Sequence, residues 1–257
     1  MLNFGFVENY REAKMIIYPQ AKINIGLYVT EKRTDGFHNI STCFFPLKLS
    51  DILEYQIFEE EGNNLDQIII TGNNIPGNPS DNLVIKACQQ LRSSNNLPYF
   101  KIHLHKIIPL GAGLGGGSSD CAAILKEIQK FANPLPSPSD IKKIALSLGS
   151  DCPFFLKPES SLAFGRGEDL TRIDVNLKGY WISVFNPGIH ISTKKAYQMV
   201  KIGIPDIPLE ESLREPIDNW KSLIHNVFEA PVFAQHPEIQ NLKEALYKAG
   251  AVYASMS

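Results

Sequence analysis

A run of glycines between a strand-like stretch and a helix-like stretch restricts most strongly what this chain can fold into. Residues 108–128 read IPLGAGLGGGSSDCAAILKEI, and five glycines fall within the seven positions from Gly111 to Gly117. Glycines let backbone N–H groups approach a ligand without a Cβ in the way. The helix that follows offers unpaired N–H groups and the positive end of its dipole. We therefore expect an anion cradle, in which Ser118 and Ser119 cap the helix, bind phosphate oxygens or reach a magnesium ion.

Three other interpretations of this loop are weaker. A P-loop requires a lysine at the helix start, and no lysine follows these glycines. The spacing of Gly111, Gly113 and Gly116 fits the dinucleotide fingerprint, but the acidic residue expected about 20 positions later is Asp140, which lies at a predicted helix start. A flexible linker rarely stands between a strand and an apolar-periodic helix. A phosphate-binding loop is therefore favoured, and a dinucleotide oxidoreductase is a distant alternative.

The overall composition disfavours several classes of protein. The 257 residues carry a formal net charge of −2 and no long basic run, which argues against a nucleic-acid partner. No apolar run approaches the roughly 20 residues needed to cross a bilayer, so no membrane partner is expected. Residues 1–14 lack the features of a secretory signal and are expected to lie outside the fold. We expect a cytoplasmic protein whose scattered cysteines are buried free thiols: Cys43, Cys88, Cys121 and Cys152.

Hydrophobic periodicity predicts strands and helices that alternate irregularly, which indicates the α+β class, with a break near residues 157–180. Asp81 or Ser80 is expected to cap the first helix, and Gly149 to end the third. Strands are expected within 15–58, at 66–71 and 100–109, and as short pieces in CPFFL (152–156) and SLAFGRGEDLTRI (161–173). Helices are expected at 82–94, 118–131, 138–148, 194–200, 217–233 and 238–250.

The glycine loop also carries a resemblance to a known family. IPLGAGLGGGSSDCAAIL resembles the P-x-x-x-G-L-x-x-S-S nucleotide loop of the GHMP small-molecule kinases. PQAKINIGLYV, DGFHNIST and LGSDCPFFL resemble the branch of that family that acts on a cytidine diphosphate methylerythritol. The similarity runs in order from about residue 17 to the C-terminus. It implies a two-domain α+β fold, with an N-terminal β/α domain at 15–160, a ferredoxin-like C-terminal domain at 161–257, and the active site in the cleft between them.

The resemblance implies ATP as the phosphoryl donor, with Mg²⁺ bridging its phosphates. Asn82 and Lys106 match positions that contact the adenosine, although as structure alone they are a helix-start residue and a strand-end charge. Ser119 is the candidate metal ligand. The loop residues implied to bind ATP are Pro109, Gly111, Gly113, Leu114, Gly115, Gly116, Gly117, Ser118 and Ser119.

The resemblance also implies a catalytic pair, Lys22 and Asp151. Strand alternation in AKINIGL puts Lys22, Asn24 and Gly26 on one face. Asp151 stands between a helix-ending glycine and a proline. Asp151 is implied to accept the proton of the substrate hydroxyl, while Lys22 orients the carboxylate and stabilises charge at the transferred phosphoryl group. The structural alternatives are a solvent-facing Lys22 and a turn residue at 151.

An acceptor pocket is implied around the turn at DGFHN. The aromatic ring of Phe37 is implied to stack on the cytosine, with His38 and Asn24 as hydrogen-bonding partners. Related proteins often carry tyrosine at position 37, and stacking survives the change to phenylalanine. Tyr197 is implied to form a second aromatic wall, with Thr193 as a weaker polar contact. A loop plug at 37 and a core residue at 197 are the structural alternatives.

The implied function is an ATP-dependent kinase that phosphorylates the 2-hydroxyl of the cytidine diphosphate methylerythritol in isoprenoid precursor synthesis. Two alternatives are another kinase of this family, acting on mevalonate, homoserine or a sugar, and a non-catalytic nucleotide-binding protein. Phe37 and His38 favour the cytidine diphosphate acceptor over mevalonate, homoserine or a sugar, because these small acceptors have no base to stack on an aromatic ring. Related kinases carry a third glycine motif where this chain ends at Ser257. We therefore expect a C-terminal domain truncated before that motif and a form that catalyses poorly. AFGRGEDL resembles a family segment to which no chemistry is assigned.

Overall fold

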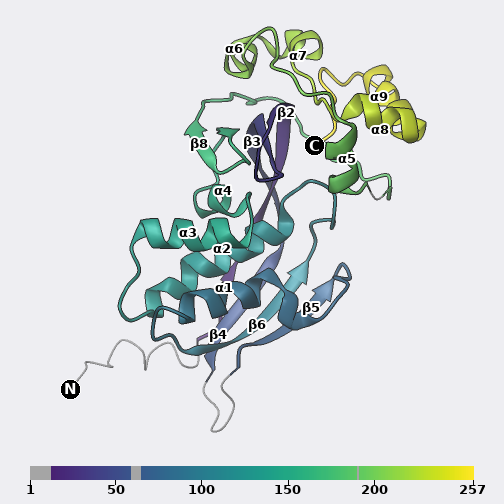
Figure 1. The fold of residues 1–257 in the computed structure, drawn as a ribbon. Helices are drawn as coiled ribbons and strands as arrows, with labels where there is room; N and C mark the ends of the chain where they lie inside the picture. The colour runs from purple at the N-terminus through teal and green to yellow at the C-terminus, as the bar shows by residue number, and fades with distance from the viewer. Residues whose placement is uncertain (1–12, 59–64, 190) are drawn as a thin grey trace, which may run out of the picture. The chain divides into compact units, whose positions relative to one another are not determined.

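The computed structural model describes residues 13–58, 65–189 and 191–257, which form two compact units (Figure 1). Of the described residues, the first unit comprises 13–21, 47–58, 65–110 and 114–158. The second comprises 22–46, 111–113, 159–189 and 191–257. Each unit is thus assembled from separate stretches of chain, and the contiguous domains expected at 15–160 and 161–257 stay a prediction. The predicted α+β class is confirmed. The extension expected at 1–14 lies, up to residue 12, outside the described residues.

The first unit is a four-stranded sheet covered by helices. Its strand order is β1 (Met15–Ile17), β4 (Ile52–Phe58), β6 (Tyr99–Lys106) and β5 (Gln67–Gly72), with β6 antiparallel to β4 and parallel to β5. Figure 1 shows α1 (Leu83–Arg92), α2 (Gly116–Ile128) and α3 (Pro138–Leu148) along one face of this sheet. Alternate residues of β6 (Phe100, Ile102 and Leu104) are buried, as period-two geometry requires. They pack with α1 and α2 in one hydrophobic core.

Two local predictions in this unit are wrong. The N-cap of α1 is Asn82, whose side chain accepts a hydrogen bond of 2.9 Å from the Val84 N–H. Ser80 and Asp81 lie instead in the short 3-10 helix η3 (Pro79–Asp81). CPFFL forms a helix, α4 (Cys152–Leu156), and not a strand. A proline in its first turn suits a helix start. The predicted end of α3 at Gly149 is confirmed.

The second unit has its own four-stranded sheet. The order is β2 (Gln20–Lys32), β3 (His38–Ser50), β7 (Ser161–Phe164) and β8 (Asp169–Arg172), and the first residues of β2 and the last of β3 belong to the first unit. Residues of β2, β3 and β7 pack with α6 (Leu209–Arg214) and α7 (Ile217–Leu223) in a core that contains Trp220. The remaining helices are α5 (Thr193–Met199), α8 (Glu229–Gln235) and α9 (Pro237–Lys248).

The helix predicted at 217–233 is two helices, α7 and α8, separated by residues 224–228. The break follows from pairing with β2. The Leu27 N–H donates to the His225 carbonyl, and the Val227 N–H donates to the Leu27 carbonyl, both at 2.9 Å. Backbone groups that bond a neighbouring strand are lost to the helix, so tertiary pairing overrides the local periodicity.

The four cysteines are free and buried, as predicted. Burial raises the pKa of the Cys43 thiol to about 12. Among the residues that the structure describes, no helix is long and apolar enough to cross a membrane. The cytoplasmic location stays a prediction.

Candidate active site

The glycine loop enters α2 through glycines with left-handed backbone angles. Gly111, Gly113 and Gly115 have φ values of 66°, 73° and 69°. Helix α2 begins at Gly116, with Gly115 as N-cap and no side-chain capping bond. The prediction that Ser118 or Ser119 caps the helix is therefore wrong, because the helix begins before them. The uncapped first turn leaves its N–H groups available for an anion, which is the geometry expected of a phosphate site.

At two positions of the loop the backbone approaches a neighbour closely, and at the first of them this contact requires glycine. A Cβ at Gly113 would collide with the backbone carbonyl of Ser257, in addition to the left-handed φ. A Cβ at Gly116 would lie 3.0 Å from the Ile108 side chain and 3.2 Å from Lys106 Nζ. The following residues differ in exposure: Gly117 is exposed, Ser118 is half-buried, and Ser119 is buried. Leu114 is also buried and anchors the loop.

A buried cluster of three charged groups lies at the base of the loop. Lys106, the last residue of β6, forms ion pairs with Asp51 and Asp120, the second at 2.7 Å. The three side chains are 1%, 0% and 3% exposed. One Asp51 oxygen also accepts backbone N–H bonds from Ile107 and Ile108, at 2.6 and 2.8 Å. The cluster thereby joins the end of β6, the loop entrance and the first turns of α2.

Lys106 was expected at the adenosine, and this role stays a prediction. In the structure its ammonium group is buried and bound to two carboxylates. The strand pattern contains a signal for that burial, because Lys106 follows Phe100, Ile102 and Leu104 on the core-facing positions of β6. The same pattern does not identify Asp51 or Asp120 as its partners, and neither was a candidate site residue.

Within the cluster, two carboxylates share a single ammonium group. Burial raises the pKa of Asp120 to about 8, while the Lys106 charge lowers it and the Asp51 carboxylate raises it further. One oxygen of Asp120 is buried and has no hydrogen-bond partner among the described residues. If Asp120 retains its proton near neutral pH, the cluster carries one negative and one positive charge. A cluster without net charge costs less free energy to bury than one with an unpaired carboxylate.

The raised pKa predicts how the stability depends on pH. Between the unfolded value of 3.8 and the folded value of about 8, the folded chain holds a proton on Asp120 that the unfolded chain has released. The free energy of unfolding should therefore fall as pH rises through this range and level off above it. Asp120→Asn keeps a neutral side chain and should flatten this part of the curve. Urea unfolding from about pH 5 to about pH 9, without nucleotide or metal, measures the difference. Parallel curves for the two proteins would contradict the prediction.

The two predicted catalytic residues belong to different units, and their pairing stays a prediction. Lys22 on β2 is 3% exposed, with its ammonium 4.9 Å from the centroid of the Phe44 ring, so the solvent-facing alternative is wrong. Asp151 is half-buried and is the N-cap residue of α4. A Cβ at Gly149 would lie 3.1 Å from Cys152 Sγ and 3.5 Å from Ser118 Oγ. The turn that carries Asp151 therefore lies against the first turn of α2.

Two of the predicted acceptor residues meet in the second unit. The rings of His38 and Tyr197 stack with centroids 5.0 Å apart, and Tyr197 also packs edge-to-face on Phe228 at 4.9 Å. Phe37 lies at the tip of the turn between β2 and β3 and is 50% exposed. The side chain of Thr193 lies outside the described part of the structure.

Asn24, the remaining predicted acceptor residue, is buried next to the C-terminal residue of the chain. Its side-chain oxygen accepts a hydrogen bond of 3.2 Å from Thr42 Oγ1. Its backbone N–H donates to Ser257 Oγ at 2.9 Å. The Ser257 carbonyl lies against Gly113. Ser257 therefore contacts both the strand that carries Asn24 and the glycine loop.

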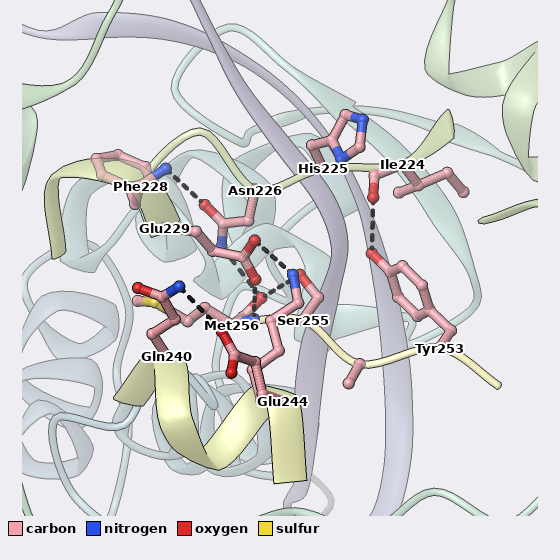
Figure 2. A network of polar contacts seen from close by, with 12 residues as sticks. Ile224, His225, Asn226, Phe228, Glu229, Gln240, Glu244, Tyr253, Ser255 and Met256 are labelled. Carbon is pink, nitrogen blue, oxygen red and sulfur yellow. Dashed lines mark hydrogen bonds and ion pairs between the residues drawn. The ribbon is translucent and has the colours of Figure 1, made fainter. Parts of the chain in front are cut away.

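The segment that carries Ser257 is held by two polar residues that the sequence did not reveal (Figure 2). The Met256 N–H donates to Glu229 at 2.9 Å, and the Asn226 amide donates to the Met256 carbonyl at 3.1 Å. The second Glu229 oxygen pairs with Lys243 at 2.6 Å. Asn226 and Glu229 are buried, so their hydrogen bonds are shielded from competing water. Met256 is thus held on both its N–H and its carbonyl.

Comparison with known proteins assigns the family. The family model described as "GHMP kinases N terminal domain" matches residues 82–157. Over 243 residues the chain is 42% identical to 4-diphosphocytidyl-2-C-methyl-D-erythritol kinase of Bacteroides fragilis, covering 95% of this chain and 88% of that protein. The chain belongs to the GHMP kinases.

Two further matches agree with this family. The protein of the same name from Cytophaga hutchinsonii is 43% identical over 244 residues, covering 95% of this chain and 88% of that protein. A crystal structure of 4-(cytidine 5'-diphospho)-2C-methyl-D-erythritol kinase superposes with a TM-score of 0.74 at 30% identity, covering 92% of this chain and 84% of that one. The GHMP kinase domain match includes Asn82, the glycine loop and Asp151. The individual roles of these residues stay predictions.

Proposed function

We propose that this chain is an ATP-dependent kinase that transfers a phosphoryl group to the 2-hydroxyl of 4-diphosphocytidyl-2-C-methyl-D-erythritol, a step of the methylerythritol phosphate pathway to isoprenoid precursors. The observation that carries the proposal is the identity of 40–43%, over 95% of this chain, to several proteins of that name. The structural similarity to a kinase of the same name supports it.

The first unit supplies the features expected of a donor site. The glycines before α2 and its uncapped first turn present N–H groups to the triphosphate of ATP. Mg²⁺ is proposed to enter with the nucleotide, since this ion is usually held by substrate phosphates, waters and few protein oxygens. The hydroxyls of Ser118 and Ser119 are the nearby oxygens of α2, and the half-buried Ser118 is more accessible than the predicted ligand Ser119. When bound, the ion would offset charge on the phosphate oxygens.

Asp151 is proposed to accept the proton of the acceptor hydroxyl. It occupies the turn after Gly149, held by a 3.1 Å bond from the Cys152 N–H to the Gly149 carbonyl and by the short helix α4. Such a turn fixes the backbone of Asp151 and with it the direction of its Cα–Cβ bond, which suits a group that must meet the hydroxyl in one orientation. Lys22, buried on β2, is proposed to supply positive charge for the transferred phosphoryl group.

The nucleotide part of the acceptor is proposed to bind at Phe37, His38 and Tyr197. Phe37 presents a half-exposed ring at the tip of a turn. The rings of His38 on β3 and Tyr197 on α5 stack on each other. Base stacking on an aromatic ring contributes about 1–3 kcal/mol, enough to select an acceptor that carries a base. An acceptor such as mevalonate, homoserine or a sugar carries no base that could stack on this exposed ring.

The test is an assay of ADP release with magnesium-ATP and four acceptors: the cytidine diphosphate methylerythritol, mevalonate, homoserine and galactose. Turnover with the first alone is expected. Turnover with one of the others would keep the kinase fold and overturn the acceptor assignment. Binding of ATP without turnover of any acceptor would favour the non-catalytic nucleotide-binding alternative.

A further inference from the structure

The segment AFGRGEDL, to which the sequence assigns no chemistry, forms the turn between β7 and β8. Gly165 and Gly167 have left-handed φ values of 63° and 115°, and the Gly167 N–H closes the turn on the Phe164 carbonyl at 2.9 Å. The Ile40 N–H of β3 donates to the Gly165 carbonyl at 2.8 Å. The Arg166 N–H donates to the Glu168 carboxylate at 2.6 Å. The turn is therefore fixed to β3, and Arg166 is held at its tip.

Arg166 lies over the ring of Phe37. The central carbon of its guanidinium group is 3.8 Å from the ring centroid, which is within the range of a cation–π contact. One face of the ring is thus covered, while half of the Phe37 surface stays exposed. A guanidinium group is planar and can lie flat on an aromatic ring at this distance, which a lysine ammonium cannot do.

Phe37 itself is held by its own turn. The Arg33 N–H donates to the Phe37 carbonyl at 2.9 Å, and the Phe37 N–H donates to the Asp35 carboxylate at 3.1 Å. Arg33 in turn pairs with Asp35 at 2.8 Å. Two turns that are far apart in sequence, 33–37 and 165–168, therefore each fix one partner of the contact between Arg166 and Phe37.

We propose that Arg166 is a specificity residue for the nucleotide part of the acceptor. It backs one face of Phe37, so that the base stacks on the other face, and it adds a positive charge beside a nucleotide that carries two phosphates. This inference rests on the proposed function for the identity of the acceptor. The rigid backing lowers the ordering cost of stacking, because the ring is already oriented before the base arrives.

The competing arrangement has the guanidinium in the place that the base takes, so that the acceptor must displace it. The two arrangements predict opposite changes in acceptor affinity when Arg166 is removed. Removing a backing group weakens acceptor binding, whereas removing a group that occupies the base's place strengthens it. The effect of one substitution on the acceptor KM therefore decides between them.

The experiment compares the wild type with Arg166→Ala, Arg166→Lys and the control Arg172→Ala, which removes an exposed arginine from β8 of the same hairpin. Arg166→Ala should raise the acceptor KM about 3- to 30-fold and leave the ATP KM within about twofold. Arg166→Lys should fall between, because it retains the charge and loses the planar stacking. Arg172→Ala should match the wild type. A lower or unchanged acceptor KM in Arg166→Ala, or an equal rise in both KM values, overturns the proposal.

A binding measurement separates this inference from the proposed function. If the wild type does not turn over the cytidine diphosphate acceptor, the proposed function has failed, and calorimetry with cytidine diphosphate tests Arg166 directly. Weaker binding by Arg166→Ala than by the wild type and Arg172→Ala supports the inference. Equal binding by these proteins, or no binding by the wild type, overturns it.

Discussion

Replacing Asp151 by asparagine is expected to lower kcat by about 10²- to 10⁴-fold, the usual contribution of a positioned general base. Asparagine has nearly the same shape, so the turn between Gly149 and α4 should keep its structure, and ATP should bind with an unchanged Kd. The amide cannot accept the proton of the acceptor hydroxyl. Single-turnover and steady-state assays with the cytidine diphosphate methylerythritol, together with calorimetry for ATP, measure both quantities.

The matched control is Asp81→Asn, which neutralises a carboxylate that is 73% exposed in the first unit. It should retain wild-type kcat and ATP affinity. A kcat in Asp151→Asn within about threefold of the wild type would remove this residue from the chemical step. A loss of ATP binding equal to the loss of kcat would instead assign Asp151 to the architecture of the donor site.

Replacing Lys106 by methionine is expected to lower the free energy of unfolding by about 3–5 kcal/mol. Methionine fills a similar volume, but it leaves the Asp51 and Asp120 carboxyl groups buried beside each other without the ammonium group that bonds both. The backbone N–H groups of Ile107 and Ile108 donate to one oxygen of Asp51. A shift of Asp51 in the variant should therefore also disturb the entrance of the glycine loop. Urea unfolding at one pH measures the change.

Lys101→Met is the control, because Lys101 stands on the same strand with an exposed side chain. Its cost should stay below about 1 kcal/mol, the range of an exposed cation–π contact such as the one it makes with Phe58. The triple variant Asp51→Asn, Lys106→Met, Asp120→Asn should recover part of the lost stability, since it leaves no uncompensated buried charge. A Lys106→Met protein as stable as Lys101→Met would show that the cluster contributes little to folding.

Local patterns in the sequence determined much of this protein. A short run of branched apolar residues predicted β5, the strand-like stretch FKIHLHKIIP predicted β6, and helical periodicity predicted α1, α3 and α9. The helix that follows the glycine loop and the helix end at Gly149 were predicted from short-range rules of the same kind, because the start and the end of a helix depend on a few adjacent residues. The family resemblance came from ordered motifs of this local kind, and the comparisons agree with it.

Tertiary structure alone decided which distant groups meet. Lys106 and Asp51 are 55 positions apart, and no pattern around either residue names the other. Arg166 and Phe37 come together because β3 and β7 are antiparallel, which places the β2–β3 turn and the β7–β8 turn at the same end of the sheet. Met256 meets Asn226 and Glu229 because Asn226 lies in the segment that pairs with β2 and Glu229 begins the helix α8 that follows. Periodicity reports which face of an element is buried, since burial depends on local geometry. It carries no information on the partner across the core, because that partner is chosen by the path of the whole chain.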